Sequence, residues 1–162
     1  MEKNLWGNLG DLESTVTYPK DILEEQAEYL NESLGGLVKC RVVRKSLSAD
    51  QILFCLKHGV TSDFSFSVKI LSDYVEHYEY EICSLIYSIK IYPMAVSFDA
   101  GIEEELRELF AVENKNMIIA HDEREFLDII QRILSSKEVH QVLSGLISIA
   151  KKEKNLLENY VF

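Results

Sequence analysis

The chain is poor in the residues that interrupt regular structure, with only 7 glycines and 2 prolines among 162 residues. This excludes a collagen-like chain and a low-complexity, disordered one. Hydrophobic residues (AVILMFWYC) make up 47% of the chain, which is ordinary globular usage. The length suits one domain, so we expect residues 1–162 to form a single α+β domain with its own core.

Cysteine and long apolar stretches are also scarce. Cys40, Cys55 and Cys83 are odd in number and widely spaced, which argues against a disulfide framework or a CxxC metal clip and indicates buried free thiols. No apolar run approaches the roughly 20 residues that cross a bilayer, and the first residues lack the apolar core of a signal peptide. We therefore expect a cytoplasmic protein that does not enter a membrane.

Motifs of common catalytic and nucleotide-binding sites are missing. The chain has no GxxxxGK[ST], GxGxxG or GxSxG pattern and no HxxxH or HExxH spacing, so we predict no cofactor, no metal and no catalytic residue from motifs. Asp99, Glu113 and Lys115 loosely imitate a metal-dependent nuclease, whose chemistry needs carboxylates on Mg²⁺ and a lysine near the attacking water. A small metal-dependent hydrolase is therefore one alternative, although a helix cap and a turn explain the same residues.

The chain has fewer basic than acidic residues: 17 lysines and arginines against 27 aspartates and glutamates, which gives a formal charge of −10. The excess lies in two segments: residues 1–36 hold 8 acids and 2 bases, and residues 99–126 hold 9 acids and 3 bases. Nucleic-acid binding is disfavoured because phosphate contacts need clustered lysine and arginine. A basic protein partner is favoured because such a field speeds its encounter, and a well-solvated acidic surface is the alternative.

Helix signals lie at both ends of the chain. Pro19 suits an opening turn, and the apolar stripe that follows it stops at Gly35, which predicts a helix. From residue 101 onward the chain is mainly helical, with helix starts predicted at Asp122 and within residues 135–138.

Alternation of apolar and polar residues predicts strands between these helices. Such runs cover residues 37–44, 64–70, 78–87 and 89–98, and Pro93 interrupts the last of them at an edge, a bulge or a break. Residues 47–58 fit either a helix opened by a Ser48–Gln51 capping box or a strand that turns back at Gly59, and their short length favours the strand. The predicted fold is a mainly antiparallel sheet of about four to six strands, with an N-terminal helix and two or three C-terminal helices packed on one face.

Aromatic residues suggest two further surfaces. Five tyrosines gather between Tyr74 and Tyr92, and the preference of tyrosine for strands accounts for them. If they are exposed, they would instead form the contact surface of a structural subunit or homo-oligomer. Trp6 is expected to pack against the domain and tie down the N-terminus.

In four short patterns the chain resembles a group of small bacterial α+β proteins. The patterns are Leu5-Trp6-Gly7, Pro19-x-x-Ile22-Leu23-x-x-Gln26, Tyr92-Pro93 and the segment from Glu123-x-x-Phe126 to Ser136. The resemblance implies a bacterial α+β domain and carries no assigned activity.

Taken together, these features favour a non-enzymatic acidic binding protein. Its concrete form is an inhibitor of the immunity or antitoxin type, which neutralises a basic bacterial protein by charge and shape complementarity. The expected partner-binding residues belong to one acidic segment or the other. They are Glu24, Glu25, Glu28 and Glu32 on the first helix, or Glu103, Glu104, Glu105 and Glu108 on the second segment.

Overall fold

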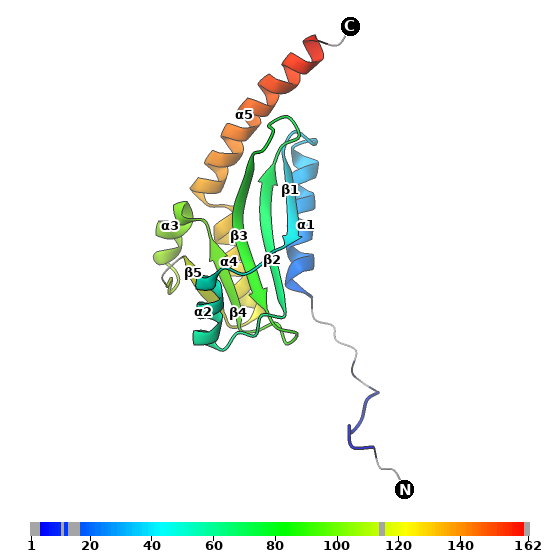
Figure 1. Cartoon of the computed structure of the whole chain (residues 1–162), viewed down its shortest axis with the longest axis vertical. Coiled ribbons are helices and arrows are strands. Elements are labelled where there is room, and N and C mark those ends of the chain that lie inside the picture. The colour runs from blue at the N-terminus through cyan, green and yellow to red at the C-terminus, as the bar shows by residue number, and fades with distance from the viewer. Residues whose placement is uncertain (1–3, 11, 13–16, 114–115, 161–162) are drawn as a thin grey trace.

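A five-stranded antiparallel sheet lies at the centre of the molecule, with helices before, within and after it (Figure 1). The computed structural model describes residues 4–10, 12, 17–113 and 116–160. The elements are α1 (Pro19–Ser33), β1 (Lys39–Arg44), α2 (Ala49–His58), β2 (Phe64–Leu71), β3 (Glu79–Tyr87), β4 (Met94–Phe98), η1 (Ala100–Ile102), α3 (Glu103–Arg107), β5 (Met117–Ala120), α4 (Glu123–Leu134) and α5 (Lys137–Asn159). The predicted α+β fold class is confirmed.

The sheet is a meander in which each strand pairs with the next, in the order β1-β2-β3-β4-β5. Val68 of β2 pairs with Cys83 of β3, whereas the next residue, Lys69, pairs with Glu81. Ile82 is thus the extra residue of a β-bulge, which bends the strand and re-aims the side chains beside it. The bulge lies where polar side chains of β3 give way to apolar ones.

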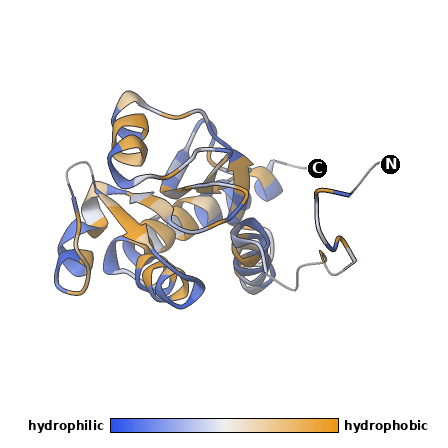
Figure 2. Ribbon diagram, turned by 90° about the horizontal axis from the view of Figure 1, so that it is seen from below, coloured by the Kyte–Doolittle hydropathy of each residue, from blue (hydrophilic) through white to orange (hydrophobic). Residues whose placement is uncertain are grey.

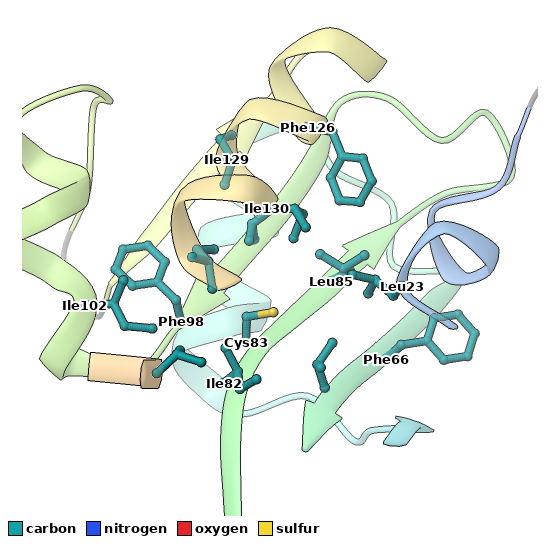
Figure 3. Close-up of a cluster of buried hydrophobic side chains, with 14 of the residues drawn as sticks. Leu23, Phe66, Ile82, Cys83, Leu85, Phe98, Ile102, Phe126, Ile129 and Ile130 are labelled. Carbon is teal, nitrogen blue, oxygen red and sulfur yellow. The ribbon is translucent and has the colours of Figure 1, made fainter. Parts of the chain in front are cut away.

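One face of the sheet carries the main core, covered by α1, α4 and the first half of α5. Leu23 of α1, Leu85 of β3, and Phe126 and Ile129 of α4 are each at most 1% exposed, and Figure 3 shows their side chains in one cluster. Burying a side chain of this size contributes about 1.5–3 kcal/mol. The helical apolar stripes seen in the sequence therefore do face the sheet.

The opposite face is only partly covered, by α2 near β4 and β5. Phe54 and Cys55 of α2 pack with Ile86, Ala95 and Met117 in a second, smaller cluster. Viewed from below, α2 lies on one side of the sheet while α1 and α4 lie on the other (Figure 2). The helices thus do not all share one face.

The expectation of a strand over residues 47–58 is wrong. Gln51 N donates to Ser48 Oγ (3.2 Å) and Ser48 N donates to Gln51 Oε1 (3.0 Å), so the capping box is complete. Gly59 ends the helix in the left-handed region, at φ 69°. Backbone groups at both ends of the helix therefore have hydrogen-bond partners, and its apolar side is buried against the sheet. Together these contributions outweigh the low intrinsic stability of a helix this short.

Three further expectations have clear outcomes. Trp6 is 82% exposed, so it does not pack against the domain. The strand expected over 89–98, with an interruption at Pro93, forms only after that proline: β4 begins at Met94, directly after the cis Tyr92-Pro93 bond. The three cysteines are free and buried, as predicted.

Among the helices in the described ranges, none combines the length and the apolar composition needed to cross a bilayer.

Candidate functional site

Helix α1 presents one continuous row of carboxylates to solvent. Asp21, Glu25, Glu28 and Glu32 are spaced four, three and four residues apart, which places them along one side of the helix, and all four are exposed. We call these four residues the acidic stripe. Leu23 is buried on the other side of α1, so the stripe faces away from the core.

Few cations neutralise the acidic stripe. The basic residue of α1, Lys20, pairs with Glu24 at 3.4 Å, to one side of the stripe. Within the described ranges no lysine, arginine or histidine forms an ion pair with a stripe residue. Of the predicted α1 contacts, Glu24 is thus paired, while Glu25, Glu28 and Glu32 keep their charge available.

The carboxylates of the stripe act together on a neighbouring phenol. The Tyr29 hydroxyl donates to Glu25 Oε1 at 3.2 Å. This hydrogen bond and the charge of Glu25, followed by the charges of Glu32 and Glu28, raise the pKa of Tyr29. The charges of Glu25, Glu28 and Glu32 therefore all act on Tyr29.

This arrangement opposes helix stability. Like charges three or four residues apart destabilise a helix by about 0.2–0.5 kcal/mol per pair. Glu32 also lies in the last turn, near the negative end of the helix dipole, where α1 has no basic residue. The stripe is thus not explained by the folding of α1.

An apolar groove runs beside the stripe, between α1, α5 and the sheet. It encloses about 280 Å³, and we define it by Leu23, Ala27 and Leu30 of α1 with Val139 and Leu143 of α5. Tyr29 also lines it and is 56% exposed, so this residue joins the groove to the stripe. Cys40 lies in its wall, where burial raises the pKa of the thiol to about 11, so the side chain is uncharged.

The second predicted acidic segment does not extend this surface. Helices α1 and α3 lie on opposite sides of the molecule (Figure 1). Glu105 accepts the backbone N–H of Lys137 at 3.0 Å and so caps α5, and Glu103 pairs with Arg107. Glu104 and Glu108 are exposed and make no hydrogen bond or ion pair with another described residue. The two acidic segments, which were predicted as alternative partner-binding surfaces, thus lie apart in the structure.

Asp99 and Glu113, the two hydrolase candidates that the structure describes, contact different sets of residues. Asp99 accepts the Tyr80 hydroxyl at 3.0 Å and the N–H of Gly101, which makes it the N-cap of η1. Glu113 instead contacts Lys57 Nζ at 3.1 Å and His58 Nε2 at 2.8 Å. Lys115 lies outside the described residues. No cluster of three potential metal-ligating side chains occurs within the described ranges.

A polar cleft, which sequence reasoning missed, lies on the sheet face opposite α1. Ser67 pairs with Ser84, and Ser84 pairs with Ser97, so three serines form a row across β2, β3 and β4. The cleft holds about 400 Å³ and is bounded by the start of α2 and by η1. The small serine side chains leave this volume open. The sequence does not show that the serines are neighbours, because their alignment depends on the register of the strands.

Charged side chains extend the row. Lys45 Nζ donates to Glu81 Oε1 (2.7 Å) and to Ser84 Oγ (3.2 Å), and Ser84 Oγ donates to the same carboxylate oxygen (2.8 Å). Burial alone would raise the pKa of Glu81, but the hydrogen bonds from Lys45 and Ser84 outweigh it and lower the pKa. The lowered pKa keeps the Glu81 carboxylate ionised as the acceptor of the hydrogen bonds from Lys45 and Ser84.

No protein-family model matches the chain, and no curated protein or solved structure is significantly similar to it. The function is accordingly inferred from the stripe, the groove and the cleft themselves.

Proposed function

We propose that the protein is a non-enzymatic binding module that docks a basic protein partner on the acidic stripe and the adjoining apolar groove. The observation that carries the proposal is the row of carboxylates on α1, which other described side chains leave almost without cations and which borders an apolar hollow. The joint surface fits a segment with lysines or arginines on one side and apolar residues on the other.

The two parts of this surface have different roles in binding. Apolar anchors in a groove supply most of the affinity of a protein interface, and charges on its rim mainly speed association and select the partner. Tyr29 lies between the groove and the stripe. Its ring can contact apolar residues of a partner, and its hydroxyl can form a hydrogen bond with polar ones. In its concrete form the module is an inhibitor of the immunity or antitoxin type, whose target is a basic protein.

The experiment uses two charge-reversed variants that change net charge equally. Glu28→Lys with Glu32→Lys alters the stripe, and Glu104→Lys with Glu108→Lys alters α3. Each protein serves as bait for extracts of its host, and the captured basic protein is then titrated by calorimetry. We expect the stripe variant to weaken binding at least about tenfold and the α3 variant to leave it unchanged, because only the stripe borders the groove.

Salt provides the second readout. Binding that depends on the stripe weakens as ionic strength rises, because salt screens exposed charges. Equal losses in both variants, or capture of no basic protein by the unaltered chain, would contradict the proposal.

Self-association through α5 is a second candidate function. The end of this helix extends past the sheet (Figure 1) and exposes Leu156 and Leu157, 48% and 58% respectively. The tyrosine-based version has less support, since Tyr87 is buried and Tyr74, Tyr80 and Tyr92 are half-buried. A salt-resistant dimer in light scattering that dissociates on Leu156→Gln with Leu157→Gln would establish this alternative.

A further inference from the structure

The C-terminal half of α5 presents a helix side that the described residues leave largely uncovered. Figure 1 shows it extending past the sheet, and residues 151–160 are all exposed. Ile149, Leu156 and Tyr160 lie along one side of this helix, seven and four residues apart, and are 50%, 48% and 74% exposed. We call residues 149–160 the α5 tail. A helix end of this length has little stability of its own in water, so its apolar side is expected to pack against another chain.

Positive charge accompanies the apolar residues of the α5 tail. Three lysines of the tail form no ion pair with a described residue: Lys151, Lys152 and Lys154. Against Glu153 and Glu158 they leave the tail one positive charge in excess, in a chain whose formal charge is −10. Lys152 follows Ile149 by three residues and precedes Leu156 by four, so it shares their side of the helix. The tail therefore has the pattern that fits an apolar groove beside a row of carboxylates.

The length of α5 allows the tail of a second copy to reach the groove. When two antiparallel α5 helices pair over their whole length, a two-fold axis passes the midpoint of the helix, which is Ser148 in Lys137–Asn159. The tail of each copy then runs along the first half of α5 in the other copy, and this half carries Val139 of the groove. Leu157 comes nine residues after the midpoint and Val139 nine residues before it, so the two lie opposite each other.

We propose that a second copy of the chain fills the apolar groove with its α5 tail, in a symmetric dimer in which each copy receives the tail of the other. The inference rests on the proposed function, because it uses the same docking surface and names a partner for it. Apolar residues of the tail enter the groove, and its lysines contact the acidic stripe.

The same alignment brings opposite charges together. Lys152 and Lys154 lie at the level of Leu143 in the other copy. Leu143 lines the groove together with Leu30 of α1, and the last two carboxylates of the acidic stripe lie two residues on either side of Leu30. The apolar contacts supply most of the affinity, and the charge pairs favour the antiparallel direction over the parallel one.

Charge reversal tests the dimer. One variant carries Lys152→Glu with Lys154→Glu in the tail, and the other carries Glu28→Lys with Glu32→Lys in the stripe. Each is expected to dimerise at least about tenfold more weakly than the unaltered chain, because like charges then meet at both contacts. A mixture of the two variants should form a heterodimer of restored affinity, because every tail then meets a stripe of opposite charge. Sedimentation equilibrium measures the dissociation constants.

A matched control makes the result specific. Glu104→Lys with Glu108→Lys changes the charge of α3 equally and should leave dimerisation unchanged, and circular dichroism confirms that each variant is folded. An unaltered chain that stays monomeric, or a mixture that recovers no affinity, would overturn the inference. A dimer that keeps its affinity in both reversed variants would show that the leucines of α5 pair without the stripe, and would overturn it as well.

The tail variant separates this inference from the proposed function. Its stripe and groove are intact, so it should still capture a basic protein from host extracts although it no longer dimerises. Capture of such a protein by an unaltered chain that is monomeric would leave the proposed function standing and overturn the dimer. A heterodimer recovered in the mixture, with no basic protein captured, would do the reverse.

Discussion

Glu81 shows how a half-buried network of hydrogen bonds stabilises a charged carboxylate. Its carboxylate accepts bonds from Lys45 and Ser84, and its pKa is lowered despite partial burial. A carboxyl group whose pKa is lower in the folded chain than the ordinary 4.5 stabilises the fold above that pH. This contribution is lost as pH falls through the folded-state pKa, because protonation removes the charge that Lys45 contacts.

The change Glu81→Gln is expected to reduce the free energy of unfolding near neutral pH. Below pH 4.5 the difference from the unaltered protein should shrink, since both side chains are then uncharged. Urea denaturation over this pH range measures the difference. Glu104→Gln, which removes an exposed carboxylate on α3, is the control and should show no such difference. A gap that stays constant into acid would mean that the Lys45 ion pair contributes nothing.

At the scale of the element, α2 forms because its ends are well satisfied. Ser48 and Gln51 exchange two hydrogen bonds at the start, and Gly59 closes the end. Three other apolar residues of α2 stay largely exposed and so contribute little packing energy: Ile52 (46%), Leu53 (64%) and Leu56 (73%). Helix α2 therefore depends on its caps together with the burial of Phe54 and Cys55.

Removal of the N-cap should thus have a measurable effect. Ser48→Ala is expected to lower the free energy of unfolding by about 1 kcal/mol, because it leaves the N–H of Gln51 without its acceptor. Urea midpoints compared at constant m-value measure the loss. Ser46→Ala, an exposed serine two residues earlier, serves as the control and should change stability little. Equal effects at the two positions would argue that the capping box is not formed.

At the scale of the whole molecule, the sheet has one fully covered face and one shared between a small core and the polar cleft. Leu85 and Ile86 are adjacent on β3, point to opposite faces and are both 0% exposed. Leu85 belongs to the main core, and Ile86 belongs to the cluster beneath α2. The second face therefore contributes to stability only where α2 covers it.

Truncation of either residue should be costly. Ile86→Ala and Leu85→Ala are each expected to lower the free energy of unfolding by about 2–5 kcal/mol, because each leaves a cavity in a buried cluster. Thermal and urea unfolding measure both. Ser65→Ala, at the β2 position that pairs with Ile86, removes a hydroxyl without a hydrogen-bond partner and should cost little. A nearly neutral Ile86→Ala would mean that α2 does not cover the sheet.

Much of the fold could be predicted from local patterns. The start of α4 at Asp122 is confirmed by the bond from Glu125 N to Asp122 Oδ1 (2.8 Å). The strand pattern around Phe64 and the burial of the thiols are also confirmed. The site was harder to predict. Glu28 and Glu32, which stay predicted partner-binding residues, are exposed and form no ion pair with described residues, whereas Glu105 caps a helix and the polar cleft was not predicted.

The sequence by itself determined most of the secondary structure, with α2 as the exception, and the acidic character of α1, because caps and apolar stripes act between residues three or four positions apart. Tertiary structure decided which sheet face α2 covers, that α1 and α3 lie on opposite sides, and that Ser67, Ser84 and Ser97 share one row. These features depend on strand register and packing between distant segments. A shift of one residue in register would turn those serines to the other face.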